Sequence, residues 1–250
     1  MSTVTLYIGS RNLSSWSLRP WLLLRHHQVT FSEHLIELDR SDTRERILAH
    51  SPSGRVPLLV DGAVRVWESL AICEYAAERY ALRDAWPAQL GARGLARAFA
   101  TEMHGGFAAL RRNLPFDATR DPAPKAVDAE TQADIDRICA IWREAREQHG
   151  AAGPWLFGEF GIVDAMFAPV ALRFEAYAVK LGKPERAYVE TVLNHRAVQQ
   201  WIEAAAAETS PAPVVTGVAA AVQSVPAARP AAPAVVKDAP RLRSVMLPTD

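Results

Sequence analysis

The stretch VPLLVDGAVRVWE, residues 56–68, decides the fold prediction for the first third of the chain. Two short apolar runs flank the dipeptide Asp61-Gly62, a sequence that two-residue β-hairpin turns favour. The run SLAICEYAAERY, residues 69–80, follows at once and has the apolar spacing of a helix. These residues therefore predict a β-hairpin that leads directly into a helix.

Upstream of the hairpin, strand-like and helix-like patterns alternate. Residues 3–9 and 31–38 have the character of strands, whereas residues 17–28 and 43–50 have helical spacing. The resulting order, βαβ followed by ββα, predicts a small mixed four-stranded sheet with helices packed against it. This α+β layout is close to that of a thioredoxin-like module.

Strand patterns stop near residue 90. The later stretches with helical apolar spacing are 91–114, 129–150, 161–181 and 185–208. We therefore expect a sheet domain over residues 1–82 and an all-helical domain over residues 90–207. Seven of the 17 prolines lie between residues 211 and 250, which predicts a disordered tail over residues 209–250. The alternative is an extended arm that docks on a partner.

The composition argues against several classes of partner. The formal charges cancel, with 28 basic and 28 acidic residues, so the chain lacks the overall positive field that non-specific binding of nucleic acid needs. No apolar run approaches the roughly 20 residues that span a bilayer, and the N-terminus lacks the pattern of a signal peptide. We expect no nucleic-acid partner, no membrane association and a cytoplasmic location.

Cysteine and histidine spacing gives no sign of a metal site. Cys73 and Cys139 are far apart and form no CxxC pair, so both are interpreted as small core residues. His26 and His27 are sequence neighbours, whose side chains diverge on a helix. No bound metal is expected.

Four serines lie in SRNLSSWSLRPW, residues 10–21, and three of them, Ser14, Ser15 and Ser17, fall where the first strand turns into the first helix. Pro20 fits only in the first turn or so of a helix, which places the helix start near Ser15 to Ser17. The free amides of that turn favour an anion such as a thiolate. The alternative is that the serines simply cap the helix.

Two other short stretches have the chemistry of a ligand site. In GRVP, Pro57 opens a strand and could be cis, which would free the backbone groups of the preceding residue for a ligand. In ESL, Glu68 and Ser69 open a helix with side chains suited to an amino group and a carboxylate, respectively. Each stretch by itself is equally typical of an ordinary helix or strand terminus.

In this order, the three stretches resemble the glutathione transferase superfamily. SSWSLR resembles the SSCSxR active-site signature of the zeta class, and SPSGRVPLLVDG is similar to the NPxGxVPxLxxDG segment. WESLAICEYAAERY is similar to the ESxAIxxYLxxxY helix, and FGEFGIVDAMFAPV to the motif that opens the buried sixth helix of the family. The resemblance covers roughly residues 3 to 205.

The resemblance implies a site residue by residue. Ser14 would donate a hydrogen bond to the sulfur of glutathione, the co-substrate, with Ser15 as the near alternative. The backbone of Val56, held by a cis Pro57, would pair with the cysteinyl portion. The other implied contacts are Glu68 and Ser69 to the γ-glutamyl end and Arg55 to the glycyl carboxylate. The second substrate would be a small electrophile, and the protein would be a homodimer.

The chain also departs from the family pattern. Trp16 replaces the cysteine of the zeta signature, which puts the isomerase chemistry of that class in doubt. Gly161 removes the side-chain half of a capping box with Asp164, with a small expected loss of stability. Tyr7 is interpreted as a core residue, with a catalytic role as the alternative.

Phe107, Arg111 and Arg112 have two interpretations: they line an acceptor pocket, or Phe107 is core and the arginines are a solvated face.

The expected function is that of a glutathione transferase. The alternatives are a glutathione-dependent isomerase or peroxidase, and a binding protein that keeps the fold without catalysis.

Overall fold

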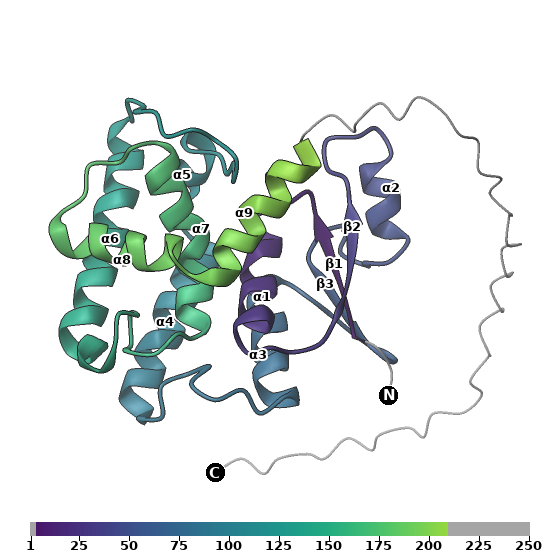
Figure 1. The fold of residues 1–250 in the computed structure, drawn as a ribbon, viewed down its shortest axis with the longest axis horizontal. Helices are drawn as coiled ribbons and strands as arrows, with labels where there is room; N and C mark the ends of the chain where they lie inside the picture. Colours follow the sequence, from purple (N-terminus) through teal and green to yellow (C-terminus); the bar gives the residue numbers. More distant parts are fainter. Residues whose placement is uncertain (1–3, 210–250) are drawn as a thin grey trace, which may run out of the picture. The chain divides into compact units, whose positions relative to one another are not determined.

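The computed structural model describes residues 4–209, and its sheet has four strands in the order β2-β1-β3-β4 (Figure 1). The strands are β1 (Thr5–Gly9), β2 (Ser32–Ile36), β3 (Leu58–Asp61) and β4 (Val64–Trp67). β1 pairs in parallel with β2, whereas the β1–β3 and β3–β4 pairs are antiparallel. The hairpin, the mixed sheet and the α+β class are therefore as the sequence predicted.

Three helices belong to this part of the chain. They are α1 (Ser15–His26), α2 (Thr43–Leu48) and α3 (Ser69–Arg79). α1 connects the parallel strands β1 and β2, and it packs against α3. Leu6 and Ile8 alternate with half-buried residues along β1 and are fully buried, as period-2 side-chain alternation requires when one sheet face is covered by helices. The strand end at Gly9 is thereby fixed next to the start of α1.

The rest of the described chain contains no further ladder strand. Its helices are α4 (Leu90–Gly105), α5 (Ala108–Asn113), α6 (Ala129–His149), the 3-10 turn η1 (Gly150–Ala152), α7 (Ile162–Ala176), α8 (Lys183–Leu193) and α9 (Arg196–Thr209). α7 is buried along nearly its whole length and packs on α1, α4 and α8. It is the helix around which the helical half is built.

Two stretches that read as single helices are broken in the structure. The stretch 91–114 divides at Gly106 and Phe107, and Phe107 has a left-handed backbone with φ of 62°. The ring of Phe107 is buried, and burial of an aromatic side chain offsets the cost of that backbone. The stretch 185–208 divides in the same way at Asn194 and His195.

Pro20 lies deeper in α1 than expected. It is inside the helix, which begins at Ser15, and so it falls beyond the first turn. A proline there removes the hydrogen bond to the carbonyl four residues earlier, that of Trp16. Pro20 thus predicted the start of the helix with a precision of about one turn, and the helix begins at Ser15, the first residue of the predicted range.

Tyr7 corrects a second expectation. It is half-buried, on the opposite face of β1 from Leu6 and Ile8, and its ring lies 4.7 Å from that of His34 and 4.5 Å from that of His50. Tyr7 is thus neither in the core nor among the residues that line the cavity described below.

Cys73 and Cys139 are buried free thiols, as expected. Within residues 4–209, no group of three or more metal-binding side chains is found, and no helix is long and apolar enough to cross a bilayer. The tail predicted for 209–250 lies, beyond Thr209, outside the described residues.

Candidate functional site

A cavity of about 640 Å³ lies between the start of α1, the approach to β3, the start of α3 and the end of α4. Its lining residues are Leu13, Ser14, Trp16, Leu38, Ile47, Gly54, Arg55, Val56, Pro57, Glu68, Ser69, His104 and Gly105. All but one of the site residues predicted from the sequence are on this surface; Ser15 is not. The structure therefore brings together three short stretches that are far apart in the sequence.

Ser14 is the N-cap of α1. Its side-chain oxygen accepts a hydrogen bond from the backbone N–H of Ser17 at 3.2 Å. It is almost fully buried and still lines the cavity. The Ser14 hydroxyl therefore fits both interpretations of the sequence, as a helix cap and as a donor to an anion. It caps the helix, and it also faces the cavity beside the amides of the first turn.

Ser15 points elsewhere. Its oxygen lies 3.4 Å from a guanidinium nitrogen of Arg173, which belongs to α7. The two serines are therefore not equivalent: Ser14 faces the cavity, and Ser15 faces the helical half.

The Val56–Pro57 peptide bond is cis, as the sequence led us to expect. The pairing of β3 with its neighbours begins at Leu58, so Val56 lies outside the hydrogen-bonded ladder. Its backbone N–H and C=O are thus available to an extended ligand that adds to the sheet as a short strand would. Arg55 is exposed at the rim of the same cavity.

Glu68 and Ser69 form the start of α3. Glu68 has φ of 70° and ψ of 126°, a backbone region that non-glycine residues rarely adopt, and its side chain does not cap the helix. The hydroxyl of Ser69 is buried and has no hydrogen-bond partner among the described residues. A buried hydroxyl beside the free amides of a helix N-terminus is suited to an anion.

His104 lies on the opposite wall, at the end of α4. Its Nε2 is 3.5 Å from a carboxylate oxygen of Glu68. Burial, together with the positive charge of Arg19, lowers the pKa of His104, and the Glu68 carboxylate only partly opposes this. His104 is therefore held toward its neutral form.

Trp16 lines the cavity, and its ring contacts two members of a group of three arginines. The guanidinium carbon of Arg19 lies 4.2 Å from the centre of the Trp16 ring, and that of Arg111 lies 4.6 Å from it. Arg19 is fully buried, and none of its three guanidinium nitrogens has a hydrogen-bond partner among residues 4–209. Stacking on an aromatic ring is the main compensation for its burial.

Arg173 completes this arginine cluster, which we define as Arg19, Arg111 and Arg173. Its Nε donates to the carbonyl of Leu114 at 2.9 Å. Its Nη1, like Nη1 of Arg111, is buried without a hydrogen-bond partner among the described residues. Burial lowers the pKa of Arg173 to about 9, and the positive charge of Arg111 contributes. Burial, followed by the charges of the other two arginines, also lowers the pKa of Arg19. Within residues 4–209 none of the three arginines forms an ion pair, and the carboxylate of Asp134 only partly opposes the effect of burial on the pKa of Arg111.

Sequence reasoning did not identify Arg19 or Arg173. The available signal was a cation inside an otherwise apolar helix, in SLRPWLLL and in FAPVALRF. Of the three acceptor candidates, Phe107 is core and Arg112 pairs with Glu130 on the surface at 3.2 Å. Arg111 is different from both, because it lies against Trp16 and bonds to backbone carbonyls at the end of α4.

Gly161 caps α7 without a side chain. The backbone N–H of Gly161 donates to Asp164 at 3.0 Å, and Asp164 also accepts from the N–H of Leu156 and the hydroxyl of Tyr188, both at 3.0 Å. One half of the capping box is therefore present, and two further donors support the buried Asp164 carboxylate.

Comparison with known proteins agrees with this geometry. Residues 13–79 match the family model of the glutathione S-transferase N-terminal domain. Glutathione S-transferase F10 of Arabidopsis thaliana is 29% identical over 154 residues, which are 58% of this chain and 69% of that protein. Dichloromethane dehalogenase of Methylophilus leisingeri is 34% identical over 65 residues, and the match spans only 24% of this chain and 23% of the dehalogenase.

Solved structures extend the likeness of fold to the helical half. A glutathione transferase homolog from Burkholderia GL BGR1, solved with bound glutathione, superposes with a TM-score of 0.61 at 21% identity. The match covers 82% of this chain and 99% of that one. The arrangement of a thioredoxin-like sheet followed by helices is thus shared over the whole of the related protein.

Proposed function

We propose that this chain, with its glutathione S-transferase N-terminal domain and the fold of the glutathione transferases, is itself a glutathione transferase. The observation that carries the proposal is the single cavity in which Ser14, the ladder-free Val56 and the unpartnered Ser69 lie together. Each supplies a group that a tripeptide thiol needs: a donor for sulfur, a backbone pair and an anion site.

The tripeptide binds across the cavity from α3 to the start of α1. The γ-glutamyl carboxylate accepts from Ser69 and the first amides of α3, and the γ-glutamyl amino group pairs with Glu68. The backbone of Val56, before Pro57, pairs with the cysteinyl residue. Arg55 at the rim attracts the glycyl carboxylate. This orientation directs the sulfur toward Ser14.

The reaction is attack of the thiolate on an electrophilic carbon. The thiol proton leaves to water, a carbon–sulfur bond forms, and the leaving group departs with its electron pair. Lowering the thiol pKa from about 8.5 to about 6.5 raises the thiolate fraction at pH 7 from roughly 3% to roughly 75%. Because nucleophilicity falls with basicity, positioning of the thiolate must supply much of the rate.

The arginine cluster supports an acceptor that carries an anionic group. Two buried arginines and the half-buried Arg111, none of which forms an ion pair among residues 4–209, favour binding of an anion, because leaving buried charges uncompensated is costly. Arg173 and Arg111 each have one buried nitrogen free to donate. A carboxylate on the electrophile would approach these donors past Trp16, which lines the cavity and contacts Arg19 and Arg111.

Retention on immobilised glutathione, followed by a panel of electrophiles, tests the function. The panel contains an aryl halide, a 2-halo acid and its neutral amide, an unsaturated keto acid and an organic hydroperoxide. Conjugation of the aryl halide or the halo acid supports a transferase. Turnover only of the keto acid or the hydroperoxide supports the isomerase or peroxidase alternative. Retention without any turnover supports the non-catalytic binding protein.

Five further properties belong to the proposal. The zeta-like subclass rests on SSWSLR, in which Trp16 stands in place of a thiol. The homodimer rests on the family resemblance, and sedimentation should give about twice 27.4 kDa. A division into domains over 1–82 and 90–207, a cytoplasmic location and a role in detoxification complete it.

A further inference from the structure

The loop that leads to Ser14 is held by the last described helix. Arg11, in this loop, donates its backbone N–H to Oε2 of Glu208 at 2.8 Å. Its backbone C=O accepts from Nε1 of Trp201 at 2.9 Å. Both main-chain groups of one loop residue are therefore satisfied by side chains of α9, almost 200 residues away in sequence.

The side chain of Arg11 strengthens the same attachment. Its guanidinium forms ion pairs with Glu208 on α9 and with Glu33 on β2. The three side chains keep only 16%, 18% and 17% of their surface exposed, so salt screens these pairs less than pairs at the open surface. The guanidinium carbon also lies 5.7 Å from the centre of the Trp201 ring.

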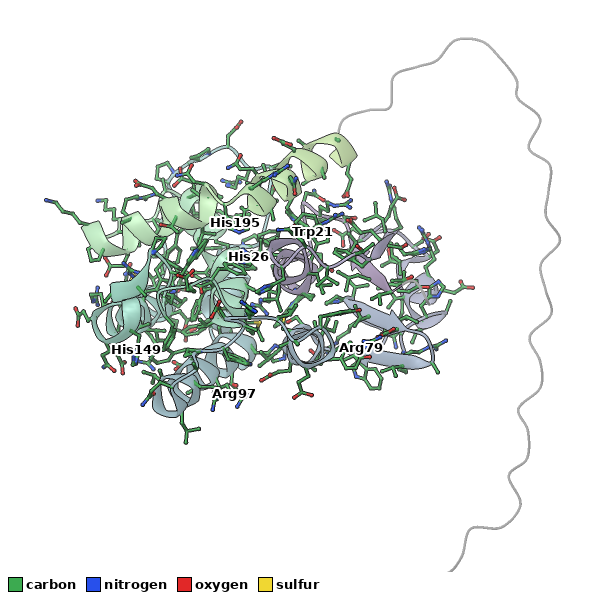
Figure 2. The ribbon with its side chains drawn as sticks, turned by 60° about the horizontal axis from the view of Figure 1, so that its bottom comes forward. Trp21, His26, Arg79, Arg97, His149 and His195 are labelled. Atoms are coloured by element: carbon green, nitrogen blue, oxygen red, sulfur yellow. The ribbon has the colours of Figure 1, made fainter. Side chains whose placement is uncertain are left out.

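α9 is itself firmly placed on α1. Trp201 is fully buried, and its ring meets that of Trp21 edge to face at 5.1 Å. At the other end of α9, Nδ1 of His26 lies 2.9 Å from Nε2 of His195, and Figure 2 shows these two histidines side by side. Figure 1 shows α9 running along α1 toward the end where β1 leads into it.

The loop has little packing of its own. On one side, Leu13 and Ser14 line the glutathione cavity. On the other side, Ser10, Asn12 and Leu13 line a second cavity of about 440 Å³, together with Glu208. A loop with hollows on both sides depends on its hydrogen bonds for position. Besides the Arg11 contacts, the backbone N–H groups of Leu13 and Ser14 donate to the carbonyl of Ser10 at 3.1 and 2.9 Å, within the loop. The carbonyl of Asn12 accepts from the N–H of Ala118 at 3.0 Å.

We infer that Glu208, supported by Trp201, is a positioning residue for Ser14. It fixes the backbone of Arg11, three residues before Ser14, and thereby sets where the Ser14 hydroxyl meets the sulfur. The inference rests on the proposed function. A shift of about 1 Å in a reacting group can cost on the order of a hundredfold in rate, so a loosened loop should cost roughly tenfold.

The test compares Glu208→Ala with Glu203→Ala in the full chain. Glu203 is exposed on the same helix, so the pair controls for loss of a helical carboxylate. The readouts are kcat and KM for glutathione with an aryl halide, the pKa of the bound thiol from its ultraviolet absorbance, and hydrogen exchange of residues 10–14 without ligand. Glu208→Gln keeps an acceptor for the Arg11 N–H, and Trp201→Phe removes the donor to its C=O while it keeps an aromatic ring in place.

We expect Glu208→Ala to lower kcat about tenfold at pH 6.5, to raise the pKa of the bound thiol and to speed exchange of residues 10–14. KM for glutathione should stay within about twofold, because its two ends are held by other elements. Glu208→Gln should recover most of the rate, Trp201→Phe should share part of the loss, and Glu203→Ala should match the wild type.

A double-mutant cycle that combines Glu208→Ala with Ser14→Ala tests whether Glu208 acts on the rate through Ser14. If Glu208 acts through Ser14, Glu208→Ala should cause no further loss in the Ser14→Ala background. Additive losses, or wild-type exchange in Glu208→Ala, would overturn this inference and leave the proposed function standing. A wild type that neither retains glutathione nor turns over would overturn both.

Discussion

The hydroxyl oxygens of Ser14 and Ser17 lie 2.7 Å apart in the first turn of α1, with Ser14 donating. Ser17 also accepts from the backbone N–H of Gly9 at 3.1 Å, so the end of β1 and the start of α1 are tied through one fully buried side chain. Hydroxyl hydrogens rotate, so Ser17 can donate to Ser14 when Ser14 donates to a ligand. In the structure the Ser14 proton is donated to Ser17, and reversal of that one hydrogen bond would make the proton available to a ligand in the cavity, while the backbone N–H of Ser17 still holds the Ser14 oxygen in place.

Ser14→Ala should lower the rate with an aryl halide by up to about a hundredfold near pH 6, because one preorganised donor to the thiolate is lost. The deficit should shrink toward pH 9, since free thiolate then forms without help. Affinity for glutathione should change little. Rates measured from pH 6 to pH 9 check this, with Ser15→Ala as the control. A pH-dependent loss in Ser15→Ala instead would assign the role to Ser15.

Arg173→Met should reduce the preference for a carboxylate-bearing electrophile over its neutral amide. Loss of a charge-assisted contact is worth about 1.5–3 kcal/mol, or roughly tenfold to hundredfold in that ratio. The ratio of kcat/KM values for a 2-halo acid and its amide measures it. Arg112→Met, which removes only a surface pair with Glu130, should leave the ratio unchanged. An equal fall in both variants would contradict a specific anion site.

Glu68→Gly should stabilise the fold and weaken glutathione binding at the same time. The backbone of Glu68 has φ of 70°, and such conformations cost non-glycine residues about 1–3 kcal/mol. Glycine removes that cost and also removes the carboxylate proposed to bind the amino group. Glu68→Ala should weaken binding without the gain in stability. Thermal melts and glutathione titrations check both, and equal melting temperatures for the two variants would refute the strain argument.

His26 should make the fold less stable as the pH falls from about 6.5 to 4. Burial, and then the charges of His27 and His195, lower the pKa of His26 from 6.5 to about 4. Between these values the unfolded state binds more protons, so stability falls as pH falls. Because Nδ1 of His195 accepts from the N–H of Ala197 at 3.2 Å, its Nε2 donates to His26, and protonated His26 loses that bond.

His26→Phe keeps a ring to stack on Phe160, which lies 4.2 Å from the imidazole, and removes the titration. Its melting temperature should depend less on pH between 4 and 6.5 than that of the wild type. His149→Phe is the matched exchange at another stacked histidine, 5.0 Å from Phe157. An equal flattening in His149→Phe would contradict the assignment to His26.

Local sequence was sufficient to predict the sheet half and most of the candidate site. Asp61-Gly62 between two apolar runs specified the hairpin, and short-range periodicity specified α1 and α3, because turn chemistry and burial of one face act over a few residues. The three stretches that contain Ser14, Val56 and Glu68 with Ser69 stood out because each lies at the end of an element, where backbone groups are free. The roles of these residues came from the resemblance to the glutathione transferase superfamily.

Tertiary structure decided the rest. Periodicity could not show that 91–114 breaks at Phe107, because burial of that ring against other helices is what offsets its left-handed backbone. The same holds for the arginine cluster and for Glu208, whose roles depend on residues far away in the sequence. Apolar periodicity reports that a face is buried, and only the packing of α7 and α9 on α1 decides what it is buried against.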